Sequence, residues 1–391
     1  MTLKTKKKVC VVGLGRIGLP LACLLATSGY DVLGVDIDDA VLDRIKCGHL
    51  RDPELGLQDS LLKAIRSSRF EVSNNIEMAD IYVIAVPTFL GPNNQPDISA
   101  VSTALESLKH HLRPNNLVII ESTCPIGTTL TATKNLRSVC PDVHVAYCPE
   151  RVLPGNLLHE LLHNNRVVGG VDEASTQKAA TFYRSFIQGD VSTTNAQTAE
   201  AVKLAENAYR DVNIAFANEL SMIADRLNLD VHEWIRLANL HPRVKILNPG
   251  PGVGGHCIAI DPWYLVGAAP DLARLTRTAR EVNNQKTEWV IQKIREEIRK
   301  NNARVVACLG LTYKPNVSDL RESPALAIVE RLEKEIKVVR VDPYIPCTIQ
   351  AQEAIKQADI VVKLVAHSPF ANIPSEYLAG KIVLDFAQAI R

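Results

Sequence analysis

Short runs of apolar, largely β-branched residues alternate with longer amphipathic stretches in the first half of the chain. The apolar runs occupy residues 9–12, 32–35, 81–86 and 117–120, with weaker ones at 143–146 and 167–168. Helical periodicity fills the intervals, for example at residues 19–28, 40–47, 57–67 and 98–110. Apolar strands that alternate with helices are typical of a parallel sheet covered on both faces. We therefore predict a doubly wound, Rossmann-like α/β domain over residues 1–195.

The pattern changes after this segment. Good helix formers run through residues 199–207 and 212–226, with apolar positions at helical spacing and no strand between them. A loop dense in glycine and proline follows at 248–256, and a further helical stretch covers 271–301. We predict a central helical segment over residues 196–300 that carries this loop.

Alternation of strands and helices then resumes towards the end of the chain. The pattern predicts strands at 304–311, 338–341, 360–365 and 382–386, with a helix at 324–334. This indicates a second, smaller Rossmann-like domain over residues 301–391. The fold class expected for the whole chain is therefore α/β, with two doubly wound domains joined by a helical segment.

Composition excludes several classes of protein. The 391 residues include 44 basic and 43 acidic side chains, so the net charge of +1 provides no strong field to hold nucleic acid or an anionic membrane. Nine cysteines without a Cys-x-x-Cys pair match neither a disulfide framework nor a zinc ribbon, and we expect no metal.

Lys6, Lys7 and Lys8 precede an apolar stretch in the manner of a signal peptide, but glycines and Pro20 interrupt it. We interpret it as a strand and a helix, and expect a cytoplasmic protein.

A Gly-x-Gly-x-x-Gly run links the first predicted strand to the first predicted helix through Gly13, Gly15 and Gly18. Such glycines permit a tight turn, close approach of a pyrophosphate and close packing of the helix, whose N-terminus then faces the phosphates. The second predicted strand ends at Asp36, roughly 20 residues further on, where a carboxylate can accept both ribose hydroxyls of NAD. We predict an NAD site; a glycine-rich turn without a ligand is the alternative.

Other residues are candidates for the same site. Arg16 and Ile17 lie inside the phosphate loop, although Arg16 could equally point to solvent. Thr88 and Thr123 follow apolar strands, at the carboxyl edge where nucleotides bind in open α/β sheets. Each threonine on its own would more often be a structural cap. Asp38 and its neighbour add negative charge that should repel the 2′-phosphate of NADP.

The most unusual segment is the glycine-rich loop that ends at His256 and Cys257, with glycines at 250, 252, 254 and 255. Glycine loses more backbone entropy on folding than other residues, so this density predicts a backbone that lies against a ligand. A cysteine at the end of such a loop can attack a carbonyl, and we interpret the other eight cysteines as small core residues. NAD chemistry with a nucleophilic thiol favours four-electron oxidation of a primary alcohol to a carboxylate, through a thiohemiacetal and a thioester.

Six motifs in order resemble the UDP-glucose/GDP-mannose dehydrogenase family over nearly the whole chain, and within it the enzymes that oxidise UDP-N-acetyl-D-mannosamine. The motifs are Cys-Pro-Glu-Arg-Val-Leu-Pro-Gly at 148–155, Glu-Ala-Val-Lys-Leu-Ala-Glu-Asn at 200–207, Asp-Val-Asn-Ile-Ala-Phe-Ala-Asn-Glu at 211–219, His-Pro-Arg-Val at 241–244, the glycine-rich loop, and Thr-Tyr-Lys-Pro-Asn-Val-Ser-Asp-Leu-Arg-Glu-Ser-Pro at 312–324.

The resemblance implies a catalytic set. Cys257 would be the nucleophile, and Lys203 would act at the sugar C6 as a proton donor or acceptor, or as an electrostatic clamp. Glu150 would activate water for hydrolysis of the thioester, and Asp261 would support that step or the first deprotonation. Asn207 would hold the oxygen at C6. Lys203 and Asn207 are four residues apart on a predicted helix, so their side chains share one face.

The resemblance also implies a substrate-binding set, whose cations suit the diphosphate of UDP. Its members, besides Lys203 and Asn207, are Arg151, Val152, Arg210, His241, Arg243, Gly254, Tyr313 and Lys314, while Arg321 would contact the cofactor. Each charged member could otherwise be a solvated surface residue. In this family the central helices form a homodimer or a higher oligomer, and the residue that matches Arg243 reaches the neighbouring subunit's site. The expected product is an acidic sugar nucleotide for surface polysaccharide.

Departures from the family's patterns bear on the substrate. UDP-glucose dehydrogenases usually carry serine before the nucleophile and lysine before the following aspartate, where this chain has His256 and Ile260. This favours a 2-acetamido sugar over glucose. Enzymes that act on UDP-N-acetylglucosamine share the Gly-Gly-His-Cys core, so that substrate or another UDP-sugar stays open. A two-electron β-hydroxyacid-type dehydrogenase and a non-enzymatic NAD-binding paralogue are the remaining alternatives. Arg16 stands where an aromatic residue is common.

Overall fold

The computed structural model describes residues 7–51, 54–152, 155–346 and 348–387. Lys6, Leu153, Pro154 and Cys347, which belong to patterns described above, lie outside these ranges. The chain divides into two compact units, Met1–Ala205 and Glu206–Arg391, and the division falls within helix α8 (Ala196–Arg226). In the described ranges no helix is both long and apolar enough to cross a membrane.

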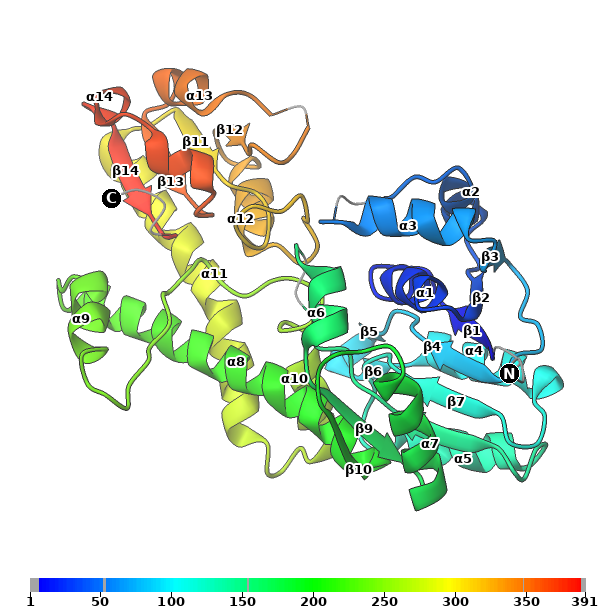
Figure 1. Ribbon diagram of the computed structural model, residues 1–391. Coiled ribbons are helices and arrows are strands. Elements are labelled where there is room, and N and C mark those ends of the chain that lie inside the picture. Colours follow the sequence, from blue (N-terminus) through cyan, green and yellow to red (C-terminus); the bar gives the residue numbers. More distant parts are fainter. Residues whose placement is uncertain (1–6, 52–53, 153–154, 347, 388–391) are drawn as a thin grey trace. The chain divides into compact units, whose positions relative to one another are not determined.

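The described residues of the first unit form an eight-stranded sheet in the order β10-β9-β8-β7-β4-β1-β2-β3 (Figure 1). Its strands are β1 (Lys8–Val12), β2 (Asp31–Val35), β3 (Phe70–Ser73), β4 (Ile81–Ile84), β7 (Leu117–Ile120), β8 (His144–Tyr147), β9 (Arg166–Gly170) and β10 (Val191–Asn195). A small antiparallel pair, β5 (Phe89–Leu90) and β6 (Pro96–Asp97), lies apart from this sheet. The α/β class predicted from the sequence is confirmed.

The sheet departs from the predicted parallel pattern at one edge. The pairs from β3 through β8 are all parallel, but β9 runs antiparallel to β8, and β10 runs parallel to β9. A connection between parallel strands must carry the chain back to the other edge of the sheet. The connection from β8 to β9 does not, because these two strands are antiparallel. Strand β9 therefore begins beside the carboxyl end of β8.

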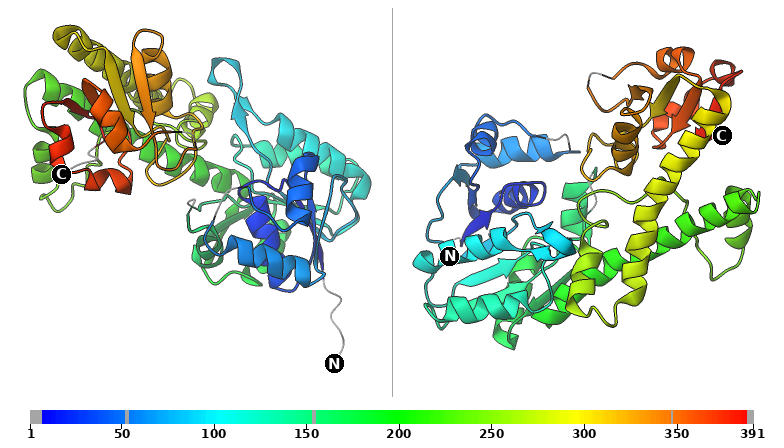
Figure 2. Two further views of the ribbon diagram at one scale, coloured as in Figure 1. Left: turned by 90° about the horizontal axis from the view of Figure 1, so that it is seen from above. Right: turned by 180° about the vertical axis from the view of Figure 1, so that it is seen from behind.

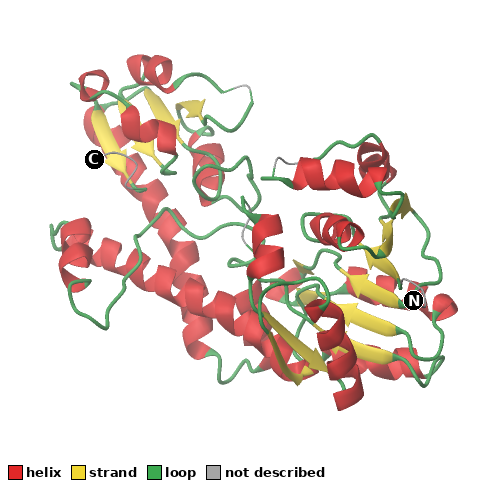
Figure 3. Cartoon of the chain, viewed as in Figure 1, coloured by secondary structure: helices red, strands yellow, loops and turns green. Residues whose placement is uncertain are grey.

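Helices cover both faces of this sheet and are drawn red in Figure 3. They are α1 (Gly18–Thr27), α2 (Asp39–Lys46), α3 (Leu57–Arg66), α4 (Ser99–Leu108), α5 (Thr128–Arg137), α6 (Leu157–His163), α7 (Glu173–Arg184) and the start of α8. Val9 and Val11 of β1 pack in one core with α1, α3 and α7, whereas Cys10 and Val12 pack in the other with α4 and α5. Alternate residues of a strand face opposite sides, which explains why both faces require apolar residues.

The second unit combines helices with a smaller sheet. The remainder of α8, with α9 (Val231–Ala238), α10 (Asp261–Ala268) and α11 (Arg274–Asn301), precedes four parallel strands in the order β12-β11-β13-β14. These strands are β11 (Val305–Leu309), β12 (Lys337–Val341), β13 (Ile360–Lys363) and β14 (Ile382–Asp385). Helices α12 (Pro324–Leu332), α13 (Ala351–Gln357) and α14 (Ser375–Leu378) complete the unit. Figure 2 shows α11 running up to this sheet, where its last turns pack with α12.

The cysteines follow the predicted distribution with one correction. Those at 10, 23, 124, 140, 148 and 308 are buried, and Cys257 is exposed. Cys47 was expected in a core but is exposed as well. Cys47 is the C-terminal cap of α2, a short amphipathic helix. It lies two residues beyond Ile45, the last buried residue of that helix, and so is on the solvent side.

Candidate active site

The phosphate loop between β1 and α1 requires glycine at two of its three positions. Gly13 has φ +94°, and a Cβ there would lie 2.6 Å from the carbonyl oxygen of Ala85. A Cβ on Gly18 would lie 1.8 Å from the carbonyl oxygen of Gly13. Gly15 is exposed with open space around it, and no side chain caps α1. The loop thus leaves backbone and a helix N-terminus open to a diphosphate, which fits NAD.

Asp36 follows β2 and braces this loop. Its Oδ2 accepts a hydrogen bond from the backbone N–H of Leu14 (2.8 Å), and its Oδ1 accepts one from the backbone N–H of Asp38 (3.1 Å). Each carboxylate oxygen has a further lone pair for a ribose hydroxyl. Arg16 and Ile17 lie half-buried just before α1. The structure therefore brings the predicted phosphate and ribose residues together at one turn.

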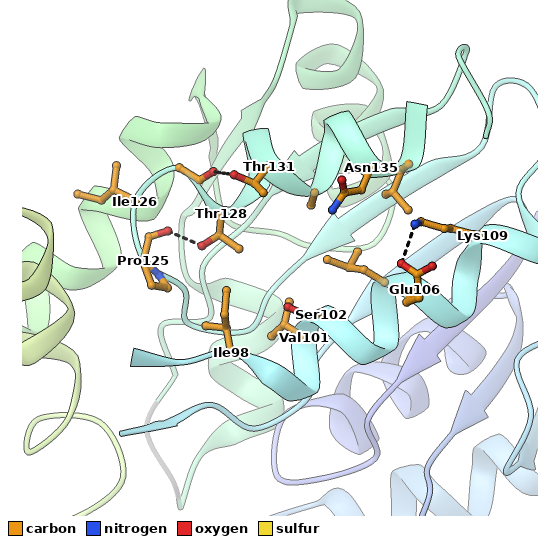
Figure 4. Close-up of a pocket in the computed structure, with 14 residues that line it drawn as sticks. Ile98, Val101, Ser102, Glu106, Lys109, Pro125, Ile126, Thr128, Thr131 and Asn135 are labelled. Carbon is orange, nitrogen blue, oxygen red and sulfur yellow. Dashed lines mark hydrogen bonds and ion pairs between the residues drawn. The ribbon is translucent and has the colours of Figure 1, made fainter. Parts of the chain in front are cut away.

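Thr88 and Thr123 follow the neighbouring strands β4 and β7 at the same edge of the sheet. The hydroxyl of Ser122 donates to the carbonyl of Val86 (2.8 Å), which joins the two segments. A cavity of about 440 Å³ lies between α4 and α5 (Figure 4), with the hydroxyl of Thr128 among its lining groups. The residues that line this cavity include none of the predicted site residues, so it is separate from the predicted active site.

Glu150 and Lys203 meet in the first unit. The ammonium Nζ of Lys203 donates to the backbone carbonyl of Glu150 (2.5 Å). The buried carboxylate of Glu150 accepts from the backbone N–H of Arg151 (2.5 Å) at Oε1 and from Nη1 of Arg166 (3.1 Å) at Oε2. The guanidinium of Arg151 donates to the carbonyl of Asn165 (3.1 Å). Two separate sequence motifs therefore converge on one segment after β8.

Glu200 explains part of the motif at 200–207. Its buried carboxylate accepts the backbone N–H groups of Gly127 (2.5 Å) and Thr129 (2.7 Å), together with the Thr129 hydroxyl (2.6 Å). A carboxylate in this position satisfies free N–H groups at the start of α5 and interacts favourably with its dipole. Because Glu200 lies just under one turn before Lys203 on α8, it fixes the part of α8 from which the lysine extends.

A buried charged cluster around Glu150 is not apparent from the sequence pattern. Arg166 is 1% exposed and Tyr183 is fully buried, and the Tyr183 hydroxyl donates to Oε1 of Glu121 (2.5 Å). Burial raises the pKa of Glu121 to about 7, against the opposing effect of Arg166. Burial also raises the pKa of the Cys148 thiol to about 12. The available signal was a charged residue directly beside an apolar run: Glu121 follows residues 117–120, and Arg166 precedes residues 167–168.

In the second unit, Cys257 lies one turn before α10 and is exposed. Its backbone carbonyl accepts the N–H of Asp261 (2.8 Å), so the two residues are joined through the backbone. The side chain of Asp261 is buried, and its Oδ2 accepts a hydrogen bond from Nδ2 of Asn207 (2.6 Å). Three predicted catalytic residues are thus connected within this unit.

The glycine-rich loop packs closely against the protein itself. A Cβ on Gly252 would lie 2.4 Å from the Thr287 hydroxyl, and one on Gly254 would lie 2.2 Å from the carbonyl oxygen of Glu322. Gly255 has φ +82°, and its Cβ would meet the ring of Tyr313 at 2.7 Å. The sequence analysis expected these glycines to make room for a ligand. At these three positions, packing against neighbouring segments of the same unit is sufficient to require glycine.

A network of buried polar groups holds the beginning of this loop. Asn218 of α8 accepts the backbone N–H of Gly250 (2.9 Å) and donates to Asn283 of α11 (2.9 Å). Asn283 in turn donates to Oδ1 of Asp211 (2.7 Å), which also accepts from Nη1 of Arg280 (2.6 Å). Asp211 and Asn218 come from the motif at 211–219, and the structure gives both a bracing role that the sequence did not reveal.

The remaining predicted binding residues are spread over the second unit. Arg321 is exposed and makes a two-pronged ion pair with Asp319 (3.0 and 2.9 Å). The other residues fall into two groups by exposure: Arg210, His241 and Arg243 are exposed, and Gly254, Tyr313 and Lys314 are half-buried. In the first unit Val152 is half-buried beside Arg151. Their contacts with a ligand stay predictions.

Three consecutive segments match the UDP-glucose/GDP-mannose dehydrogenase family: its NAD binding domain over residues 7–187, its central domain over 197–285 and its UDP binding domain over 307–391. The UDP-N-acetyl-D-mannosamine dehydrogenase of Methanocaldococcus jannaschii is 45% identical, over 97% of this chain and 92% of its own. The NDP-N-acetyl-D-galactosaminuronic acid dehydrogenase of Ralstonia nicotianae is 44% identical, over 97% and 95%.

A solved structure gives the same result. The UDP-D-ManNAc dehydrogenase of Pyrococcus horikoshii matches with a TM-score of 0.93 at 36% sequence identity, covering 98% of this chain and 96% of that one. All three likenesses extend over nearly the full length of the chain. The chain therefore belongs to the UDP-glucose/GDP-mannose dehydrogenase family.

Proposed function

We propose that this protein is an NAD-dependent UDP-N-acetyl-D-mannosamine 6-dehydrogenase. It oxidises the C6 alcohol of the sugar to the carboxylate and consumes two NAD⁺ and one water. The observation that carries this proposal is the exposed Cys257 thiol, one turn before Asp261, whose side chain accepts a hydrogen bond from Asn207 of α8, in a chain that also has the NAD fingerprint. A two-electron oxidation would have no use for a thiol at that place.

The cofactor and substrate residues divide between the described units. Gly13, Gly15, Gly18 and Asp36 would hold the diphosphate and ribose of NAD, with Arg16, Ile17, Thr88, Thr123 and Arg321 as further contacts. Bound NAD supplies the hydride acceptor for both oxidations. Cations among Arg151, Arg210, His241, Arg243 and Lys314 suit the UDP diphosphate, and Val152, Gly254 and Tyr313 complete the predicted substrate set.

The first half of the reaction ends in a covalent adduct. Lys203 or a water held by Asp261 accepts the proton of the C6 hydroxyl as the aldehyde forms, and Asn207 holds the C6 oxygen. The sulfur of Cys257 then adds to the aldehyde carbon, and the oxygen takes up a proton to give a thiohemiacetal. An ammonium group has three N–H donors, so Lys203 can keep its bond to the Glu150 carbonyl and still donate to that oxygen.

The second half releases the acid. Oxidation of the thiohemiacetal leaves a thioester on Cys257. Glu150 accepts a proton from a water molecule while the water oxygen attacks the thioester carbon, and the sulfur of Cys257 leaves as a thiolate. The carboxylate product departs, and the thiolate is ready to take up a proton or to attack again. This scheme gives each of the five predicted catalytic residues a role.

The subunit organisation belongs to the same proposal. We divide the chain into an NAD-binding domain (1–195), a central dimerisation segment (196–300) and a UDP-sugar-binding domain (301–391), and we place the protein in the cytoplasm. Support for a homodimer comes from α8, where Tyr209, Phe216 and Ile223 are exposed at seven-residue intervals and so share one helix face. Replacing Phe216 by Glu should shift the protein towards monomers, as measured by light scattering. In the dimer, Arg243 would act in the active site of the neighbouring subunit.

The identity of the sugar is tested by comparing substrates side by side. Purified protein is given UDP-N-acetyl-D-mannosamine, UDP-N-acetylglucosamine and UDP-N-acetylgalactosamine in parallel, and NADH formation is measured. The proposal expects the highest kcat/KM for the mannosamine compound. The galacto-configured sugar is the alternative with a specific observation behind it, because the Ralstonia relative is nearly as similar as the Methanocaldococcus one.

The thiol is tested by alkylation in a suitable background. Cys47 is exposed like Cys257 and would also react with the reagent. Both Cys47 and Cys347 are therefore replaced by Ser before the experiment. Iodoacetamide should then abolish turnover in step with modification of Cys257, and prior substrate binding should slow both. Turnover that survives complete alkylation would overturn the proposal. The untreated Cys47→Ser, Cys347→Ser protein, which retains the proposed site, serves as the control.

A further inference from the structure

We propose that Arg166 is a positioning residue that aims the carboxylate of Glu150 at the hydrolytic water. The inference rests on the proposed function, in which Glu150 activates water. It assigns a role to a residue outside the predicted catalytic set.

The antiparallel direction of β9 brings Arg166 into contact with Glu150. Ala146 and Tyr147 of β8 pair with Gly170 and Gly169 of the antiparallel β9. When the same register is continued past the end of β8, Glu150 lies opposite Arg166, and the two side chains form an ion pair of 3.1 Å. The guanidinium also donates to the Leu161 carbonyl (3.4 Å). Arg166 is therefore fixed by a strand and by the helix before it, and it holds one oxygen of Glu150 in a defined direction.

A second cation lies beside the Arg166–Glu150 pair. The Lys203 ammonium donates to the backbone carbonyl of Glu150 (2.5 Å), whereas Arg166 contacts its side chain. The neighbouring groups Tyr183 and Cys148 stay neutral because burial raises the pKa of both. Arg166 is therefore the charged group that sets the direction of the Glu150 carboxylate, while Lys203 holds its backbone.

The test isolates the hydrolysis step. Enzyme in excess is mixed with NAD and UDP-N-acetyl-D-mannosamine and quenched in acid, and the Cys257 adduct is followed by intact mass while NADH is followed by absorbance. In Arg166→Gln the thioester should decay at least about tenfold more slowly, with the first NADH formed at nearly the wild-type rate, since a general base typically contributes 10²–10⁴-fold. Arg166→Lys, which keeps the charge, should recover part of the loss.

Glu173→Gln, which alters an exposed carboxylate of α7, is the matched control for Arg166→Gln and should behave as wild type.

The outcomes separate the two proposals. Equal slowing of both NADH-forming phases in Arg166→Gln would overturn this inference and leave the proposed function intact. Absence of any Cys257 adduct in the wild-type protein under rapid turnover would overturn both.

Discussion

Each unit buries one arginine against a carboxylate, and the two sites differ in what surrounds the pair. Arg280 donates to Asp211 at 2.6 Å, and the side-chain amide of Asn283 donates to the same carboxylate oxygen at 2.7 Å. Amides do not titrate, and one arginine balances one carboxylate. This arrangement suits a fixed scaffold, and it ends at the backbone of Gly250 in the loop that carries Cys257.

The cluster of the first unit differs in that one of its carboxyl groups has no ion-pair partner of its own among the described residues. Arg166 pairs with Glu150, whereas Glu121 is buried and accepts a hydrogen bond from the neutral Tyr183 hydroxyl. Burial raises the pKa of both Glu121 and Asp211, but Asp211 has Arg280 as its ion-pair partner. A scaffold gains nothing from a carboxyl without such a partner, since its desolvation is unfavourable. We infer that the balanced network serves geometry and that the unbalanced one serves chemistry. Perturbed carboxyl groups are indeed concentrated at functional sites.

The largest effect is expected where the balanced network is broken. Asp211→Ala leaves the buried charge of Arg280 without its partner, and loss of one member of such a pair destabilises by roughly 3–5 kcal/mol. Urea unfolding measures the change. Asp211→Leu combined with Arg280→Met should be much milder, because no charge is left unmatched. A double variant as damaged as the single one would contradict the scaffold interpretation.

A smaller effect is expected in the loop that this network holds. Gly254→Ala forces a Cβ to within 2.2 Å of the Glu322 carbonyl, so the loop must shift, and overpacking of this kind destabilises by about 1–3 kcal/mol. We expect a clear fall in kcat even where the fall in melting temperature is small, because Cys257 moves with the loop. Gly250→Ala, whose Cβ has no neighbour nearer than 3.9 Å, is the matched control. Equal activity of the two variants would show that the loop position does not matter.

The smallest effect is expected at Glu121, in the unbalanced cluster of the first unit. The pKa of Glu121 is raised above its ordinary value of 4.5 to about 7, so its favourable contribution is complete below pH 4.5 and is lost as the pH rises through about 7. Glu121→Gln should therefore raise the melting temperature at about pH 8, by roughly 2–4 °C per kcal/mol gained, and have little effect at about pH 5. A variant that is destabilised at both pH values would contradict this assignment. Scanning calorimetry at the two pH values provides the measurement.

Local patterns predicted much of the fold and only part of the site. The apolar runs located β1, β2, β4 and β7, and the glycine fingerprint located the turn that fits NAD, because both depend on short stretches of chain. Strand β10 (Val191–Asn195) was missed since it is a polar edge strand without an apolar run. The contact of Glu150 with Arg166 could not be predicted, because it depends on the reversal of β9. The bond between Asn207 and Asp261 likewise joins residues that only tertiary structure brings together.

The central claim is that one thiol allows the same pocket to oxidise one carbon twice. It is tested most directly by giving the enzyme a limiting, weighed amount of UDP-N-acetyl-D-mannosamine with excess NAD and measuring the total NADH at completion. The account predicts two NADH for each sugar nucleotide consumed, with the uronate as product and no free aldehyde. In Cys257→Ser the same measurement should give far slower formation of NADH and no uronate at the wild-type rate. A yield of one NADH per substrate in the wild-type protein would contradict the account.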